Sequence, residues 1–310
     1  MNTVNTRQCR KIIPFAGILL SALCLLLFLL WSGSEPRYQG QALSYWLAAL
    51  DNPSTATNVQ TITALKSMGA KAAVRLVPML EASDSPFKLR VVELARKQAL
   101  IQVHFTPASV KQQRAERAFE CMGEQASAAA PGLASLLIRR GSEPPQYLGD
   151  PASRAANALG CLGYRAIPYL RPALRSEHAR VRYSGVSVLA LCSLDTAPET
   201  MTELLKLLDD ADPKVRTAGA YALGKVHRHS GLVIPRLARM LADVNPSARK
   251  QAALAIGHFG SQASNALATL RQMCSDVAPE VRSAAAAALT EVGGAPGREE
   301  ASVPGLRGDP

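Results

Sequence analysis

The sequence predicts an all-α protein in which one N-terminal transmembrane helix precedes an α-solenoid, a right-handed superhelix of about seven stacked helix pairs. Three observations predict this fold class. Apolar residues make up 48% of the 310 residues but aromatic residues only 5%, which disfavours β-sandwiches and barrels because those folds draw on aromatic and β-branched side chains. Residues 12–31 carry no charge. From residue 210 onward, an Asp, a Pro and an Arg recur every 33 residues.

The charge-free segment predicts a membrane span, because a helix over 12–31 is long enough to cross the ~30 Å hydrocarbon core of a bilayer. The basic residues before it are Arg7, Arg10 and Lys11. By the positive-inside rule, residues 1–11 stay in the cytoplasm and the segment acts as a signal anchor. We therefore expect a single-pass protein of the bacterial inner membrane with its repeats on the periplasmic side. Cleavage within the predicted linker, residues 32–40, followed by secretion, is the alternative.

The repeats occupy residues 41–293, and each one predicts a pair of helices. The clearest copies read Asp210-x-x-Pro213-x-Val215-Arg216, Asp243-x-x-Pro246-x-Ala248-Arg249 and Asp276-x-x-Pro279-x-Val281-Arg282. The first helix should start at the Pro, because a missing N–H costs nothing in the first turn, and Asp212 and Asn245 are good N-caps. A second apolar helix follows a short link. Stacked pairs bury a continuous core that one pair alone cannot form.

Two segments depart from this pattern. The interval between Gly69 and Gly123 is about one helix too long for a single repeat, and residues 86–103 read as an inserted helix. Residues 294–310 are rich in Gly, Pro and charged side chains, which predicts a disordered tail.

The pattern D-x-x-P-x-V-R followed by A-x-A-L-G resembles HEAT repeats, specifically the short HEAT-like repeats of phycobilisome lyases. The resemblance extends over about residues 55–293 and is strongest after Arg182. The segment Tyr38–Leu47 also resembles the lead-in of membrane-anchored, exported bacterial HEAT-repeat proteins. The family resemblance implies a protein-binding solenoid whose second helices line its concave side. It also leaves open a bilin lyase or chaperone-like activity.

The repeated charges are interpreted as a structural ladder. The ladder residues are Asp210, Arg216, Asp243, Arg249, Asp276 and Arg282. A constant period should stack them into ion pairs and turn hydrogen bonds. A catalytic row of carboxylates is the alternative, but Asp beside Arg has a lowered pKa and makes a poor general base.

The sequence predicts no enzyme, no cofactor and no metal site. It contains no phosphate-binding loop, dinucleotide-binding, zinc-protease or nucleophile-elbow motif. The di-iron HEAT hydroxylases need His-Glu dipeptides, and no histidine here is followed by Glu. His227 and His229 are read as solvated turn residues rather than as a metal pair. Cys121 and Cys161 occupy matching places in neighbouring repeats, either as buried thiols or as a disulfide.

The formal net charge of +11 predicts acidic partners. The candidate concave binding patch consists of Arg171, Arg175, Arg236 and Arg239. A secondary basic patch in the inserted helix consists of Lys88, Arg90, Arg96 and Lys97. We expect a non-catalytic, membrane-anchored scaffold that binds acidic proteins in the cell envelope and no small molecule. The scarcity of aromatic residues in the repeats disfavours nucleic-acid binding, which is an alternative only if the repeats are cytoplasmic.

Overall fold

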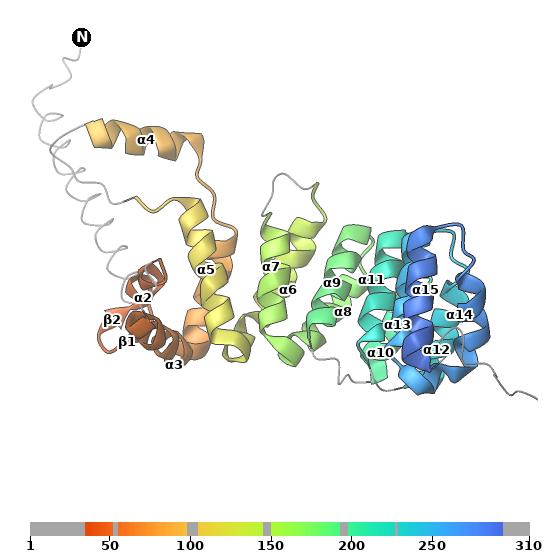
Figure 1. The fold of residues 1–310 in the computed structure, drawn as a ribbon. Coiled ribbons are helices and arrows are strands. Elements are labelled where there is room, and N and C mark those ends of the chain that lie inside the picture. Colours follow the sequence, from red (N-terminus) through yellow and green to blue (C-terminus); the bar gives the residue numbers. More distant parts are fainter. Residues whose placement is uncertain are drawn as a thin grey trace, which may run out of the picture.

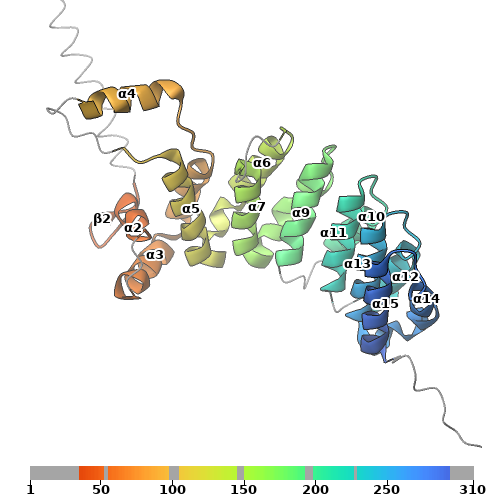
Figure 2. The ribbon, with the colours of Figure 1, turned by 45° about the horizontal axis from the view of Figure 1, so that its top comes forward.

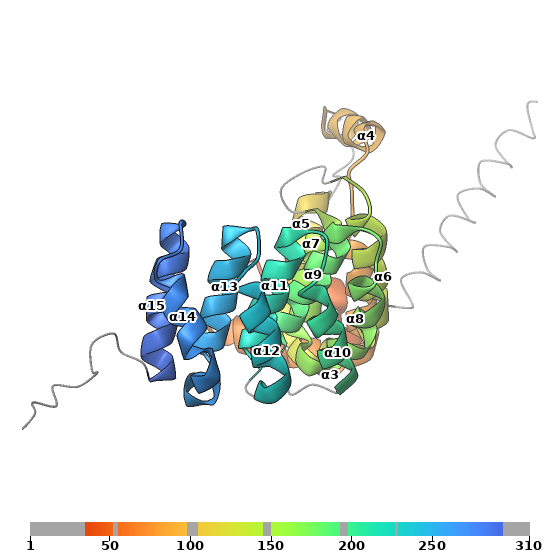
Figure 3. The ribbon, with the colours of Figure 1, turned by 90° about the vertical axis from the view of Figure 1, so that its right-hand side faces the viewer.

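Two layers of helices form an elongated array (Figure 1). The computed structural model describes residues 35–51, 55–97, 105–144, 150–192, 198–226 and 229–293. Within these ranges lie six helix pairs and one further helix at the C-terminal end, close to the expected seven units. Figure 2 shows the pairs following one another from α3 to α15, and Figure 3 shows the array turned by 90°, with α15 at the left.

The first layer contains the first helix of each pair. Its members are the first half of α3 (Thr55–Leu80), α5 (Ala108–Met122), α7 (Pro151–Cys161), α9 (Ala179–Leu191), α11 (Pro213–Gly224), α13 (Pro246–Gly257) and α15 (Pro279–Val292). Each of these helices packs on the next, and each second helix packs on the first helix of the following pair.

The second layer runs alongside the first. Its members are the second half of α3, α6 (Ala130–Gly141), α8 (Ile167–Leu174), α10 (Pro198–Leu207), α12 (Ser230–Met240) and α14 (Leu267–Met273). Three 3-10 segments lead into these helices: η1 (Gly123–Ala129), η2 (Gly163–Ala166) and η3 (Gly260–Ala266). The apolar side chains between the layers are fully buried, among them Leu65, Phe119, Leu159, Leu189, Leu223 and Ile256.

The predicted helix starts are confirmed. Pro213 and Pro246 stand in the first turns of α11 and α13. The Asp212 carboxylate accepts a hydrogen bond from the backbone N–H of Lys214, and the Asn245 side chain accepts from Ser247. These caps satisfy donors that the first turn of a helix leaves without a partner.

Glycine is required where a first helix passes into its second helix. Gly69 and Gly123 have φ angles of 50° and 55°, a region that residues with a Cβ atom rarely adopt. Gly69 lies inside α3, so that this long helix is two helices joined at a kink. The predicted short link is therefore a reversal at a glycine in these repeats, whereas before α12 the residue with a positive φ angle is His229.

A small N-terminal cap covers the start of the array. Strands β1 (Arg37–Tyr38) and β2 (Gln41–Ala42) pair in an antiparallel hairpin, and α2 (Leu43–Ala49) packs on α3. Leu43, Trp46 and Leu47 on α2 are buried. Part of the predicted linker over 32–40 thus forms a strand, and the expected all-α architecture carries one short hairpin.

Helix α4 (Pro86–Lys97) stands apart from both layers in Figures 1, 2 and 3. It covers part of the predicted inserted helix over 86–103, whose last residues lie outside the described ranges. Asp84 holds the two ends of the insertion together, since its carboxylate accepts from Ala108 N at 2.7 Å and from Lys88 Nζ at 2.9 Å. These hydrogen bonds, that of Ala108 first, lower the pKa of Asp84.

The predicted localisation requires correction. The expected membrane span, residues 12–31, lies outside the described residues, as do residues 1–11 and the tail 294–310. In the part of the chain that the structure describes, no helix has both the length and the apolar character needed to cross a membrane. The longest, α3, is kinked at Gly69 and carries Lys66, Lys71 and Arg75. The assignment to a single-pass inner-membrane protein therefore lacks support and is not retained.

Candidate functional site

A groove of about 620 Å³ lies on the first layer, across α9, α11 and α13. Its apolar lining comes from Tyr183, Leu191 and Tyr221. All three side chains are exposed, Tyr183 by 45% and Tyr221 by 42%. A volume of this size falls within the range of ligand pockets, and exposed aromatic rings in a concave site are typical of protein-binding surfaces.

The helical period explains why the tyrosines face outward. On α11, Val215 and Leu223 point inward and are fully buried, so Tyr221 lies on the opposite side of the same helix. Small neighbours such as Ala190 and Ala218 leave space between the rings. The groove is therefore the outer surface of three stacked helices, hollowed because their exposed side chains differ in size.

Polar groups surround the apolar lining. Ser247 and Gln251 contribute from α13, Asn245 from its N-cap, and Thr217 from α11. Lys214 is the charged residue of the lining, and its ammonium group forms no ion pair within the described residues. Lys225 adds positive charge nearby, with its Nζ atom 4.7 Å from the centroid of the Tyr221 ring. The groove thus combines aromatic surface with uncompensated positive charge.

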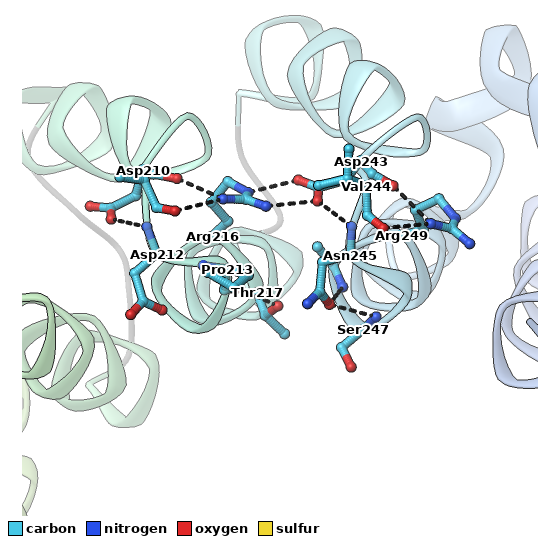
Figure 4. Close-up of polar contacts among 12 residues, drawn as sticks. Asp210, Asp212, Pro213, Arg216, Thr217, Asp243, Val244, Asn245, Ser247 and Arg249 are labelled. Atoms are coloured by element: carbon cyan, nitrogen blue, oxygen red, sulfur yellow. Dashed lines mark hydrogen bonds and ion pairs between the residues drawn. The ribbon is translucent and has the colours of Figure 1, made fainter.

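The ladder residues are close in sequence to part of the groove lining, since Arg216 precedes Thr217 and Asp243 lies two residues before Asn245. Arg216 donates from Nε to Asp243 at 2.7 Å and from Nη2 to the same carboxylate at 2.8 Å (Figure 4). Its Nη1 group donates to the carbonyl oxygen of Asp210 at 2.8 Å. Arg216 therefore binds the backbone of its own turn and the carboxylate of the next turn. Figure 4 shows Thr217 and Ser247, which line the groove, on the same side of this row.

The same geometry recurs along the array. Arg182 binds Asp210, and Arg249 binds Asp276, each through Nε and Nη2 at 2.7–2.8 Å. Each carboxylate also accepts a backbone N–H within its own turn, as Asp243 does from Asn245 at 2.8 Å. These contacts fix the spacing of successive first helices. The sequence period alone does not reveal that each Asp pairs with the Arg of the preceding repeat.

The ladder keeps its carboxylates ionised. Hydrogen bonds from Arg216 lower the pKa of Asp243, although partial burial opposes the shift. Arg249 likewise lowers the pKa of Asp276, helped by the N–H of Ala278. At Asp210, burial acts to raise the pKa, but the hydrogen bonds from Arg182 and Asp212 outweigh it. Such groups are weak bases, which favours a structural role over a catalytic one.

We expect the ladder to make stability depend on pH in the acid range. The folded-state pKa values of Asp243 and Asp276 lie below the unfolded value of about 3.9. Their contribution is therefore fully present above about pH 4 and is lost as the pH falls through the folded values. Urea unfolding between pH 7 and pH 2 should show this loss. The slope below pH 4 should be smaller in Asp243→Asn, and an unchanged slope would contradict the ladder's role.

The predicted arginine patch lies in the second layer, away from the groove. Arg171 is on α8, Arg175 ends α8, and Arg236 and Arg239 are on α12. Between them, α10 and the turn that follows it supply acidic partners. Arg175 pairs with Glu203, and Arg236 Nη2 lies 2.7 Å from a carboxylate oxygen of Asp209. The four arginines are thus interrupted by carboxylates rather than forming one continuous basic surface, and ligand binding by them stays a prediction.

The secondary basic patch lies on α4. Arg90 is exposed, and Lys88 pairs with Asp84 while its Nζ atom lies 4.8 Å from the centroid of the Phe105 ring. Arg96 and Lys97 belong to the last turn of the same helix. Phe87, which is 77% exposed, and Leu94 lie on the same helix as these charges. This surface is separate from the groove and from the second layer.

The cysteines provide no reactive centre in the described ranges. Cys121 and Cys161 are half-buried free thiols, and burial, more than the neighbouring Glu120 carboxylate, raises both of their pKa values. Burial raises the pKa of Cys192 to about 11. His229 is exposed at the start of α12, whereas His227 lies outside the described residues. The described residues contain no cluster of potential metal ligands.

Sequence reasoning missed the groove because it searched for charge rather than for aromatic surface. Tyr183 and Tyr221 are exposed aromatic residues on first helices of the array. The helical period places both outside the buried stripe, which is the signal that could have identified them. Their closeness in space depends on how α9 and α11 stack.

Comparisons with known proteins agree with this architecture. The sequence pattern of HEAT repeats matches residues 146–224 and 234–308, together about half of the chain. No curated protein sequence matches the chain. Among solved structures, the fold is similar to that of the karyopherin Kap121p bound to the extreme C-terminus of the protein phosphatase Cdc14p. That match has 14% identity and a TM-score of 0.50, and it covers 81% of this chain but 29% of the karyopherin.

Two other solved structures are more distant in shape. The complex of CpcE and CpcF of phycocyanin lyase from Nostoc sp. PCC7120 is 23% identical, with a TM-score of 0.43, over 52% of this chain and 98% of that chain. Human deoxyhypusine hydroxylase in complex with glycerol is 21% identical, with a TM-score of 0.35, over 83% and 85%. With its matched repeats, its two helical layers and its Asp–Arg ladder, this chain belongs to the HEAT-repeat family.

Proposed function

We propose that this chain is a non-catalytic scaffold that binds a segment of another protein in the groove across α9, α11 and α13. The observation that carries the proposal is the groove itself, with two exposed tyrosines and one uncompensated lysine in its lining. Kap121p, which has a similar fold, is seen with the C-terminal segment of another protein bound. Protein binding by a surface of the solenoid is the role supported by these features.

The chemistry of the lining identifies the kind of segment. Tyr183 and Tyr221 offer flat, rigid surface to an aliphatic or aromatic side chain, and aromatic residues of this kind contribute strongly to binding. Lys214 favours a carboxylate on the partner, beside that side chain. The overall positive charge of the chain also disfavours basic partners. Gln251 and Asn245 can donate to the carbonyl groups of an extended backbone. The partner segment should therefore be short, partly apolar and acidic.

Selection from a displayed library of random 12-residue peptides tests this proposal. The chain should enrich peptides that carry Asp or Glu close to an apolar residue. Tyr221→Ala should weaken binding of a selected peptide by about tenfold or more, because loss of a central aromatic contact costs roughly 2 kcal/mol. Isothermal titration calorimetry measures this change. The melting temperature should change little, since Tyr221 lies outside the buried face of α11 and is 42% exposed.

Charge reversal provides the specificity test. Lys214→Glu should shift the enriched peptides from acidic to basic sequences, because the sign of the charge in the lining changes. Lys71→Glu, a matched reversal at an exposed site on α3, should leave the selection unchanged. Equal binding of the selected peptides to the wild type, Tyr221→Ala and Lys214→Glu would show that the groove is not the site.

A further inference from the structure

Helix α4 projects from the array. In Figures 1 and 3, which differ by a turn about the vertical, it lies above the ends of the other described helices, and in Figure 1 it runs across their direction. No residue of α4 belongs to the hydrophobic core of the described part of the chain. A flat surface can therefore approach α4 from above without meeting the other described helices.

One face of α4 is apolar and exposed. Phe87, Val91 and Leu94 follow the spacing i, i+4, i+7, which places them on one side of a helix. Their exposed fractions are 77%, 47% and 61%. Single exposed apolar residues are common on protein surfaces, but a contiguous apolar patch marks a site of interaction with a protein or a membrane. The apolar face of α4 is therefore a candidate contact surface.

Positive charge accompanies this face. Helix α4 has a net charge of +3, from four basic residues and one acidic residue: Lys88, Arg90, Arg96, Lys97 and Glu93. By the helical period, Lys88 lies beside Val91 at one edge of the apolar face, and Arg90 lies beside Leu94 at the other. Lys88 pairs with Asp84 but stays 41% exposed, and Arg90 is exposed. Basic side chains at the edges of an apolar face can reach lipid phosphates while the apolar residues enter the bilayer.

We propose that α4 is an interfacial helix that binds the surface of a bilayer containing anionic lipids. Phe87, Val91 and Leu94 enter the boundary between head groups and acyl chains, and Lys88 and Arg90 contact lipid phosphates. The projecting position favours a bilayer over a cleft in another protein, because a bilayer is flat and covers one side of the helix. This contact is not a membrane span. With 12 residues, α4 is about 18 Å long, too short for a hydrocarbon core of about 30 Å.

Amide hydrogen exchange in α4 tests the proposal on the full chain mixed with vesicles. Vesicles of phosphatidylcholine with about one third phosphatidylglycerol should slow this exchange by about tenfold, because burial of the apolar face stabilises the helix. Phosphatidylcholine alone should slow it much less, since it offers no net negative charge to Lys88 and Arg90. Salt at about 0.5 M should weaken the effect of the anionic vesicles. A readout confined to α4 excludes vesicle binding through other parts of the chain.

Two pairs of variants separate the apolar contact from the charge. Leu94→Glu should abolish the slowing, whereas Leu232→Glu, at a 60% exposed site on α12, should leave it unchanged. Arg90→Glu should reduce the slowing severalfold, whereas Lys71→Glu on α3 should not. The proposal is overturned if neutral vesicles slow the exchange as much as anionic ones, or if Leu94→Glu keeps the full slowing. It is also overturned if anionic vesicles leave the exchange unchanged, a result that would assign the apolar face to a cleft in another protein.

Discussion

Replacing Arg216 with alanine should lower the free energy of unfolding by about 3 kcal/mol. Arg216 and Asp243 are only 13% and 10% exposed, so removal of the guanidinium group leaves a largely buried carboxylate without its partner. The carbonyl oxygens of Asp210 and Ala211 lose their donor as well. The lost interactions are those that join α11 to α13. Urea unfolding followed by circular dichroism measures it.

Arg139→Ala is the matched control. Arg139 also forms an ion pair, with Glu81 at 2.9 Å, but its side chain is 59% exposed, and such pairs contribute less than about 1 kcal/mol. The loss of unfolding free energy in Arg216→Lys should fall between the losses in Arg216→Ala and Arg139→Ala. Lysine keeps the positive charge but cannot bridge a carboxylate and two carbonyl groups at once. If Arg216→Ala and Arg139→Ala cost the same, the ladder does not hold the repeats together.

Two glycine-to-alanine substitutions should shift stability in opposite directions. At Gly224 a Cβ atom would lie 2.8 Å from both Cα and Cβ of Ala255, so that α11 and α13 would have to move apart. Overpacking of this kind costs about 1–3 kcal/mol. At Gly231, on α12, a Cβ atom meets nothing within 4 Å. Alanine there should stabilise the fold by up to about 1 kcal/mol through its better helix propensity.

Thermal unfolding of the two variants measures this difference. Gly224→Ala should melt below the wild type and Gly231→Ala at or above it. Both substitutions add the same methyl group to a helix, and they differ only in what that group meets. A melting temperature for Gly224→Ala at or above that of the wild type would show that the two helices are not in the close contact described.

Features set by local chemistry were predictable from the sequence. Pro213 and Asn245 mark helix starts because the missing donor and the capping oxygen act within a single turn. The 33-residue period likewise predicted stacked helix pairs, because no pair can bury its apolar face alone. These inferences need only neighbouring residues or a repeat count, and both are visible in the sequence.

Features that depend on how repeats stack could not be obtained in this way. A period does not show whether Arg216 pairs with Asp210 of its own turn or with Asp243 of the next turn. Nor does the spacing of Arg175 and Arg236 reveal that Glu203 and Asp209 lie beside them, because those contacts join different helices. The groove between Tyr183 and Tyr221 depends on the separation of α9 and α11, which is set by packing.

The direction of the ladder gives the repeats between Arg182 and Asp276 two unlike ends. Each of these 33-residue units extends a guanidinium group toward its successor and offers a carboxylate to its predecessor, as Arg216 and Asp243 do. Units of this kind join head to tail, so gene duplication can add one without leaving a charge unmatched. Deletion of exactly residues 211–243 would place Asp210 directly before the turn that now follows Asp243. Arg182 would still pair with Asp210. The array can therefore change length during evolution while keeping its chemistry, whereas a deletion out of step with the period would leave both ends unpaired.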